Sequence, residues 1–187
     1  MKIACLGWGS LIWDPRVLPI RGSWFEDGPF LPIEFGRESN GKRITLVIAN
    51  VEHTVQSLWA LISVANIEEA KRKLAERESI SEGNIRYSIG FWERSTGACH
   101  GKVAAQIGTW AERQHLDAVV WTNLKCGFTG TRGQMPTYAQ ILKHLKGLQH
   151  EESKVSEEYV RRAPIQIDTE YRRRLVMDLG WAPLKAQ

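Results

Sequence analysis

The chain has 187 residues, of which 43% are hydrophobic and 25% are charged, and its formal net charge is +4. These values are typical of a soluble globular protein, exclude a disordered or fibrous chain, and favour a single domain over residues 1–187. No stretch approaches the roughly 18 consecutive apolar residues that cross a bilayer, so we expect no membrane partner.

The cysteine and histidine patterns exclude the common metal and disulfide frameworks. Cys5, Cys99 and Cys126 form an odd set without Cys-x-x-Cys spacing, and the five histidines show no His-x-x-x-His spacing. We therefore expect no metal ligands and a reducing compartment. Because Gly7 and Gly9 interrupt the N-terminal apolar run, it resembles a first strand more than a signal peptide, and a cytoplasmic location is predicted.

The positive charge raises the alternative of nucleic-acid binding, with eight tryptophans as possible stacking surfaces. The basic residues are mostly interleaved with acidic ones, as in residues 68–73, which argues against a nucleic-acid partner. The run Arg172-Arg173-Arg174 is the main exception, and we interpret it as the solvated face of a C-terminal helix.

The N-terminal part of the chain is predicted to be rich in strands. Ile3–Trp13 contains a short apolar strand that leads into a turn. Ile33–Arg37 and Arg43–Ala49 are extended segments joined by Ser39-Asn40-Gly41-Lys42, and Asn-Gly between such runs is typical of a β-hairpin. A further buried strand is expected at Val55–Ser63.

The first helix is predicted to run from Asn66, a good N-cap residue, to about Glu78. At 100° per residue, Glu78 falls on the apolar stripe that includes Ile67 and Leu74, whereas Glu76 points nearly the opposite way. A carboxylate on the apolar side is costly unless it is paired, hydrogen-bonded or protonated. Glu78 is therefore a candidate functional residue, although a structural bond to a nearby arginine or backbone amide is the alternative.

The rest of the chain changes from strands to helices. Extended segments are expected at Ile85–Trp92, Gly101–Ile107 and Asp117–Trp121, with a helical turn at Ala111–Leu116. Three helices follow, at Pro136 to about Leu148, from a Ser156 cap to Arg162, and from a Thr169 cap to Gly180. This order predicts an α+β fold, in which helices flank a mixed sheet that is either a closed β-barrel or curved and half-closed.

The turn after the first strand is a second candidate site. Gly7 and Gly9 supply bare backbone, and Ser10 adds a hydroxyl, so the turn is suited to holding an anion or oxyanion. A β-bulge or a tight barrel turn is the commoner reason for such glycines, and Glu78 is what favours the functional interpretation.

Together these motifs resemble the γ-glutamylcyclotransferase-like superfamily. Trp8-Gly9-Ser10-Leu11-Ile12 is similar to its N-terminal Tyr-Gly-Ser-x-Leu signature, and Leu74–Ser79 is similar to its Leu-Asp-x-x-Glu-Gly motif. Pro136-Thr137-Tyr138 and Glu157–Val160 resemble two C-terminal segments more weakly. The chain departs from the family at Trp8, Leu11 and Ser79, which stand where tyrosine, often asparagine, and glycine are found, and a divergent bacterial branch shares the Gly-Ser-Leu-Ile-Trp start.

The resemblance implies an enzyme that cyclises a γ-glutamyl amine or peptide to 5-oxoproline and releases the amine. It gives Glu78 the role of general acid and base, and it gives substrate contacts to Trp8, Gly9, Ser10, Leu11 and Tyr138. It requires no metal and no organic cofactor, and its partner is a small γ-glutamyl-type molecule. The oligomeric state stays open.

The same residues are compatible with several alternatives. A noncatalytic module that binds a small metabolite on the same fold is the main one. Cys126 with His100 or His144 could supply a thiol and a base, but no protease signature surrounds the cysteine. Residues 125–133 are glycine-rich and basic without the ending of a P-loop, and we interpret them as a mobile loop that covers the pocket.

Overall fold

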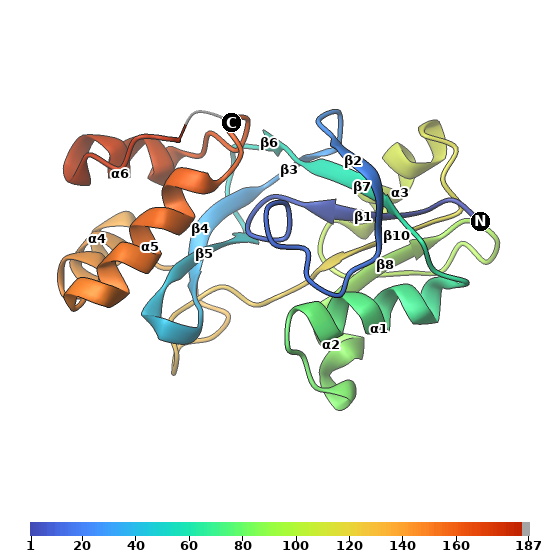
Figure 1. The fold of residues 1–187 in the computed structure, drawn as a ribbon, viewed down its shortest axis with the longest axis horizontal. Helices are drawn as coiled ribbons and strands as arrows, with labels where there is room; N and C mark the ends of the chain where they lie inside the picture. The colour runs from blue at the N-terminus through green and yellow to red at the C-terminus, as the bar shows by residue number, and fades with distance from the viewer. Residues whose placement is uncertain (185–187) are drawn as a thin grey trace. The chain divides into compact units, whose positions relative to one another are not determined.

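The computed structural model describes residues 1–184, which form two compact units (Figure 1). The first unit contains residues 1–7, 11–31 and 56–124, and the second contains residues 8–10, 32–55 and 125–184. Each unit is thus assembled from several separate segments of the chain. Two-residue strands, β3 (Phe30–Leu31) and β6 (Val55–Gln56), lie where the chain passes from one unit to the other.

The first unit is built on a mixed six-stranded sheet with the order β2-β7-β1-β10-β8-β9. The central strand β1 runs parallel to β10 and antiparallel to β7, and the other neighbours are antiparallel. The strands are β1 (Ile3–Gly7), β2 (Ile20–Phe25), β7 (Leu58–Ile62), β8 (Ile89–Glu93), β9 (Cys99–His100) and β10 (Ala118–Thr122).

Helices cover both faces of this sheet. Ile3 and Cys5 of β1 belong to the apolar cluster of α1 (Ile67–Arg77), which lies along one face (Figure 1). Trp92 of β8 points to the opposite face, where it packs on Gly108 of α3 (Ala104–Arg113). All five residues of β1 are consequently buried, as expected for a strand covered on both sides. A 3₁₀ turn (Glu82–Asn84) and the short α2 (Ile85–Ser88) link α1 to β8.

The second unit combines a β-hairpin with three helices. β4 (Ile33–Glu38) and β5 (Ile44–Ile48) pair antiparallel around a 3₁₀ turn at Asn40–Lys42, where Gly41 has a φ of 72°. The predicted Asn-Gly hairpin is therefore confirmed. The helices are α4 (Tyr138–Lys146), α5 (His150–Arg162) and α6 (Glu170–Leu179).

Helix ends with a local side-chain signal lie where the sequence predicts them. The Asn66 side chain accepts a hydrogen bond from the Glu69 amide at 3.0 Å, which caps α1. Thr169 caps α6, and Gly180 ends it in the left-handed conformation with a φ of 72°. The two caps join residues that are only three positions apart, and the end of α6 depends on the conformation of one glycine. Such local features can be predicted from the sequence alone.

Three expectations about secondary structure are wrong. Gly101–Ile107 is not extended, because α3 begins at Ala104 after a left-handed Val103. Ile85–Ser88 is helical, so β8 starts only at Ile89. Ser156 does not begin a helix, because α5 starts at His150 with a capping box of Gln149 and Glu152, which leaves Ser156 buried in its interior.

The predicted α+β class is confirmed. Within residues 1–184 the large sheet is open, with β2 and β9 as its edges, so the closed barrel of the original prediction is not formed. The pairing of β2 with β7 is irregular, because its register shifts between Arg21 and Phe25. In the same part of the chain, no helix has the length and apolar character needed to cross a membrane.

Candidate functional site

Glu78 ends α1 and faces inward, as predicted. Its side chain is 19% exposed, compared with 54% for Glu76 two positions earlier. The helix delivers Glu78 to this position because Leu74 and Ala75, one turn earlier, are anchored in the apolar cluster of the first unit. Helical periodicity, which is a local property, thus fixes the direction of the carboxylate.

Arg77 is the partner of Glu78, and it is more deeply buried than the acid. The Arg77 side chain is 5% exposed, and its Nη1 lies 2.6 Å from Oε1 of Glu78. Its Nε and Nη2 also donate to the carbonyl oxygen of Asp14, at 3.1 and 2.7 Å. Arg77 therefore fastens the end of α1 to the loop that follows the N-terminal motif, across 63 positions of sequence.

Cys5, in the middle of β1, is near enough to this ion pair to be affected by both of its charges. Burial and the negative charge of Glu78 raise the pKa of the Cys5 thiol well above its ordinary value, and Arg77 opposes that shift. Cys5 is thus a buried apolar residue and not a nucleophile. Leu11, the last residue of the predicted substrate-binding turn, packs in the same apolar cluster and is 6% exposed.

The two oxygens of the Glu78 carboxylate differ in their contacts. Oε1 is held by Arg77, whereas no residue among 1–184 donates a hydrogen bond to Oε2. A partly exposed carboxylate with one unengaged oxygen can accept a proton from a ligand and return it. The arginine partner is also what a purely structural ion pair at a helix end would show, so this geometry is compatible with both interpretations.

The predicted substrate-binding turn is divided between the units, since Trp8, Gly9 and Ser10 belong to the second unit and Leu11 to the first. Trp8 is 4% exposed, and its indole Nε1 donates to the Leu46 carbonyl at 3.4 Å. Trp8 is therefore a packing residue of the second unit.

Gly9 lies directly against Tyr159 of α5. A Cβ atom added at Gly9 would overlap the Tyr159 hydroxyl, so this position needs glycine for close approach. The Tyr159 hydroxyl in turn accepts a hydrogen bond from the Leu46 amide at 3.4 Å. Packing thus explains the glycine of the motif, and it leaves the turn held between β5 and α5.

Tyr138, the weakest of the predicted substrate contacts, joins α4 to α6. Its hydroxyl donates to Asp178 at 2.7 Å, and the guanidinium of Arg174 lies 3.8 Å from the centre of its ring. Burial, followed by the contact with Asp178, raises the pKa of the Tyr138 hydroxyl above its ordinary range. These contacts give the side chain a structural role in the second unit, and its contact with substrate stays a prediction.

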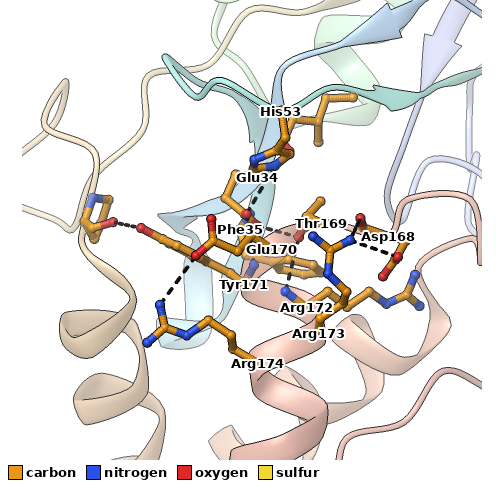
Figure 2. A network of polar contacts seen from close by, with 12 residues as sticks. Glu34, Phe35, His53, Asp168, Thr169, Glu170, Tyr171, Arg172, Arg173 and Arg174 are labelled. Carbon is orange, nitrogen blue, oxygen red and sulfur yellow. Dashed lines mark hydrogen bonds and ion pairs between the residues drawn. The ribbon is translucent and has the colours of Figure 1, made fainter.

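Glu34 is a buried carboxylate that the sequence analysis did not single out (Figure 2). It is 0% exposed, and it accepts hydrogen bonds from the Thr169 hydroxyl at 2.5 Å and from the amides of Phe35 and Tyr171 at 2.7 and 3.0 Å. His53 Nε2 lies 3.4 Å from its Oε2. Burial raises the pKa of Glu34, although these hydrogen bonds and His53 oppose the shift.

Glu34 belongs to β4, but its carboxylate contacts the first residues of α6, and this contact gives it a structural role. A carboxylate at a helix N-terminus is favoured by the helix dipole and by the amides that have no partner inside the helix. The sequence signal was a charged residue between the apolar Ile33 and Phe35, but strand alternation places such a residue on a solvated face. The contacts with Thr169 and Tyr171, more than 130 positions away, override that expectation.

The interpretation of Arg172-Arg173-Arg174 as a solvated helix face is wrong for Arg172, which is buried. It is 1% exposed and donates to the carbonyls of Ala163, Pro164 and Ile167 at 2.5 to 3.1 Å. Burial lowers the pKa of its guanidinium to about 10. Arg173 and Arg174 are exposed and pair with Asp168 and Glu170, so only they match the prediction.

The glycine-rich segment 125–133 is fixed to β4 by several bonds. Arg37 Nη1 donates to the Lys125 carbonyl at 2.7 Å, the Gly127 amide donates to Gly36 at 2.7 Å, and the Thr129 amide donates to Glu38 at 2.6 Å. Within residues 1–184, no group of three or more acidic, histidine or cysteine side chains is arranged to hold a metal ion.

Comparison with known proteins gives no relative for this chain, since no family model, no curated protein and no solved structure matches it. Any function must therefore be argued from the residues themselves.

Proposed function

We propose that this chain is a γ-glutamylcyclotransferase-like enzyme that converts a γ-glutamyl amine or peptide into 5-oxoproline and a free amine. The observation that carries the proposal is the half-buried Glu78 carboxylate, one oxygen of which has no donor among residues 1–184. Arg77 connects this carboxylate to the carbonyl of Asp14, close in sequence to the motif Trp8-Gly9-Ser10-Leu11. Arg77 thus joins the Glu78 motif to the segment that follows the N-terminal motif along the chain.

The reaction is an intramolecular aminolysis of the γ-amide bond, and it needs no water. The neutral α-amine of the substrate attacks its own γ-carbonyl carbon, and a new C–N bond closes the five-membered ring. Glu78 takes the proton that the attacking nitrogen loses and gives it to the leaving nitrogen as the original amide bond breaks. General acid–base catalysis of this kind typically contributes about 10²–10⁴-fold in rate.

The N-terminal turn is proposed to hold the negative charge of the substrate. Backbone amides of Gly9, Ser10 and Leu11 are suited to a substrate carboxylate or to the oxyanion that forms at the γ-carbon. The close packing of Gly9 on Tyr159 supports a rigid turn, which is what a preorganised anion site requires.

The proposal is tested with purified protein and γ-glutamyl dipeptides or γ-glutamyl amines as substrates. We expect release of 5-oxoproline, detected by mass spectrometry, and a drop of at least about 10²-fold in kcat for Glu78→Gln because the proton acceptor is lost. Glu76→Gln is the matched control, since it removes an equal charge from the exposed side of the same helix. Equal kcat values for Glu78→Gln and the native protein would refute the role of Glu78.

The noncatalytic alternative makes a different prediction for the same samples. A binding module would be stabilised thermally by the γ-glutamyl compounds but would release no 5-oxoproline. Stabilisation without turnover would therefore replace the enzyme proposal by the binding proposal.

A further inference from the structure

The second unit contains an arginine that no acidic side chain neutralises. Arg43 follows the hairpin turn, and its guanidinium carbon lies 4.7 Å from the centre of the Tyr159 ring. None of the ion pairs formed by residues 1–184 includes Arg43, and the neighbouring Glu152 is paired with Lys42 at 3.0 Å. A guanidinium that stacks on an aromatic ring keeps its in-plane N–H donors available for an anion.

Three polar atoms in this region are shielded from solvent and have no hydrogen-bond partner among the described residues. They are Nε of Arg43, Oγ of Ser39 and Oγ of Ser156. Ser39 and Arg43 lie on the two sides of the hairpin turn, where the Ser39 amide donates to the Arg43 carbonyl at 2.7 Å. Buried polar groups are normally paired, so these three unpaired atoms need an explanation.

The register of α5 places Ser156 beside the hairpin. Residues three or four positions apart share a helix face, and Glu152, Ser156 and Tyr159 follow that spacing. Glu152 contacts Lys42 and Tyr159 contacts Arg43, so Ser156 between them also faces the residues that flank the turn. Ser156 is 0% exposed, which excludes bulk water as the partner of its hydroxyl.

We propose that Arg43, Ser39 and Ser156 form a receptor for an oxyanion, the carboxylate or phosphate group of a small ligand. The guanidinium supplies the charge and directional donors that planar oxyanions require, and the two hydroxyls supply further donors. Tyr159 holds Arg43 on its ring face, and its hydroxyl lies against Gly9. The receptor is built wholly within the second unit and does not depend on the proposed cyclotransferase activity.

The test is isothermal titration calorimetry of the full chain with inorganic phosphate and, separately, with glutarate, at an ionic strength held constant with sodium chloride. We expect saturable binding of at least one of these anions, and the preferred one identifies a phosphate or a carboxylate ligand. Arg43→Gln should weaken the Kd at least about tenfold, because the hydrogen bonds that it removes involve charged groups. Arg162→Gln on α5 is the control, because it removes the same charge from a residue paired with Glu158, and its Kd should change less than about twofold.

The Ser156→Ala variant gives a second test, because its effects on thermal stability and on anion binding should differ in direction. In the absence of anion it should leave the Tm equal or raise it, since it removes an unpaired buried hydroxyl and introduces a better helix former. It should nevertheless weaken anion binding, and it serves in place of Arg43→Gln if that variant does not fold. The proposal is overturned if neither anion binds in preference to chloride, or if these variants bind the anion as tightly as the native chain.

Discussion

At the scale of single residues, the two inward-facing carboxylates differ in what surrounds them. Glu34 is enclosed completely and accepts three hydrogen bonds from Thr169, Phe35 and Tyr171. Glu78 is partly exposed, and Arg77 engages only one of its oxygens. A fully satisfied carboxylate holds elements together, whereas one with an unengaged oxygen can exchange a proton with a ligand.

The structural role of Glu34 predicts a loss of stability in Glu34→Gln. The amide has one acceptor oxygen, so it cannot accept from both Phe35 on Oε1 and Tyr171 on Oε2. One buried N–H is left without a partner, which costs about 1–3 kcal/mol. Urea unfolding at neutral pH measures this difference in the free energy of unfolding, and an unchanged midpoint would show that the network is dispensable.

The same pair of proteins tests the pKa of Glu34. Because burial raises this pKa above its ordinary value of 4.5, the folded state binds the proton more tightly than the unfolded state. The resulting stability is fully present below pH 4.5 and is lost as the pH rises through the folded pKa. The advantage of the native chain over Glu34→Gln should thus shrink as the pH rises from 4, and a growing advantage would contradict the assignment. A His53→Gln background repeats the comparison without the imidazole that lies 3.4 Å from the Glu34 carboxylate.

At the scale of elements, α1 connects a local signal to the candidate site. Asn66 caps its first turn, and Glu69 strengthens the start by accepting a hydrogen bond from the Ala65 amide at 2.7 Å. The other end of the helix carries Arg77 and Glu78. Stability of α1 therefore influences how firmly the Glu78 carboxylate is positioned.

Replacement of the cap tests this connection. Asn66→Ala should lower the free energy of unfolding by about 1 kcal/mol, because the Glu69 amide loses its acceptor. Asn66→Asp should retain most of the stability, since aspartate also caps and its charge suits the helix N-terminus. Chemical denaturation of the two variants measures both effects, and equal losses would mean that the cap hydrogen bond contributes nothing.

The incorrectly predicted elements depend on contacts outside themselves. The segment Gly101–Ile107 was expected to be extended, but Gly101 and Val103 take left-handed φ values of 110° and 52° and redirect the chain into α3. That helix then needs Gly108 to accommodate the ring of Trp92 from β8. Neither the strained Val103 nor the partner of Gly108 is visible in the local pattern, because both follow from packing against the sheet.

At the scale of the whole molecule, both units are discontinuous in sequence. The first contains three segments and the second also contains three, so the chain passes between them several times. Independent domains usually occupy continuous stretches joined by one linker. The interleaved order therefore supports the prediction of a single domain over residues 1–187, which stays a prediction until folding is measured.

Calorimetry tests that prediction directly. We expect one thermal transition, with a calorimetric enthalpy equal to the van't Hoff enthalpy, because neither unit is a chain segment that can fold alone. The same transition should be followed by tryptophan fluorescence and by circular dichroism at a common midpoint. Two resolved transitions, or different midpoints for the two probes, would show two domains.

Features that depend on near neighbours can be predicted from a single sequence. In this chain they are the α+β class, the Asn40-Gly41 hairpin, the caps Asn66 and Thr169, and the inward direction of Glu78. These features follow from helical periodicity, turn preferences and contacts three positions apart, which a single sequence contains.

The surroundings of the charged groups, in contrast, depend on long-range packing. The burial of Glu34 and Arg172, the carbonyl of Asp14 that receives Arg77, and the grouping of Trp8–Ser10 with the second unit were not visible in the sequence. Most of these depend on partners tens to more than a hundred positions away, brought together by packing of the apolar core. The free energy of a buried charge depends on those partners, and for that reason its role emerges only when the chain is folded.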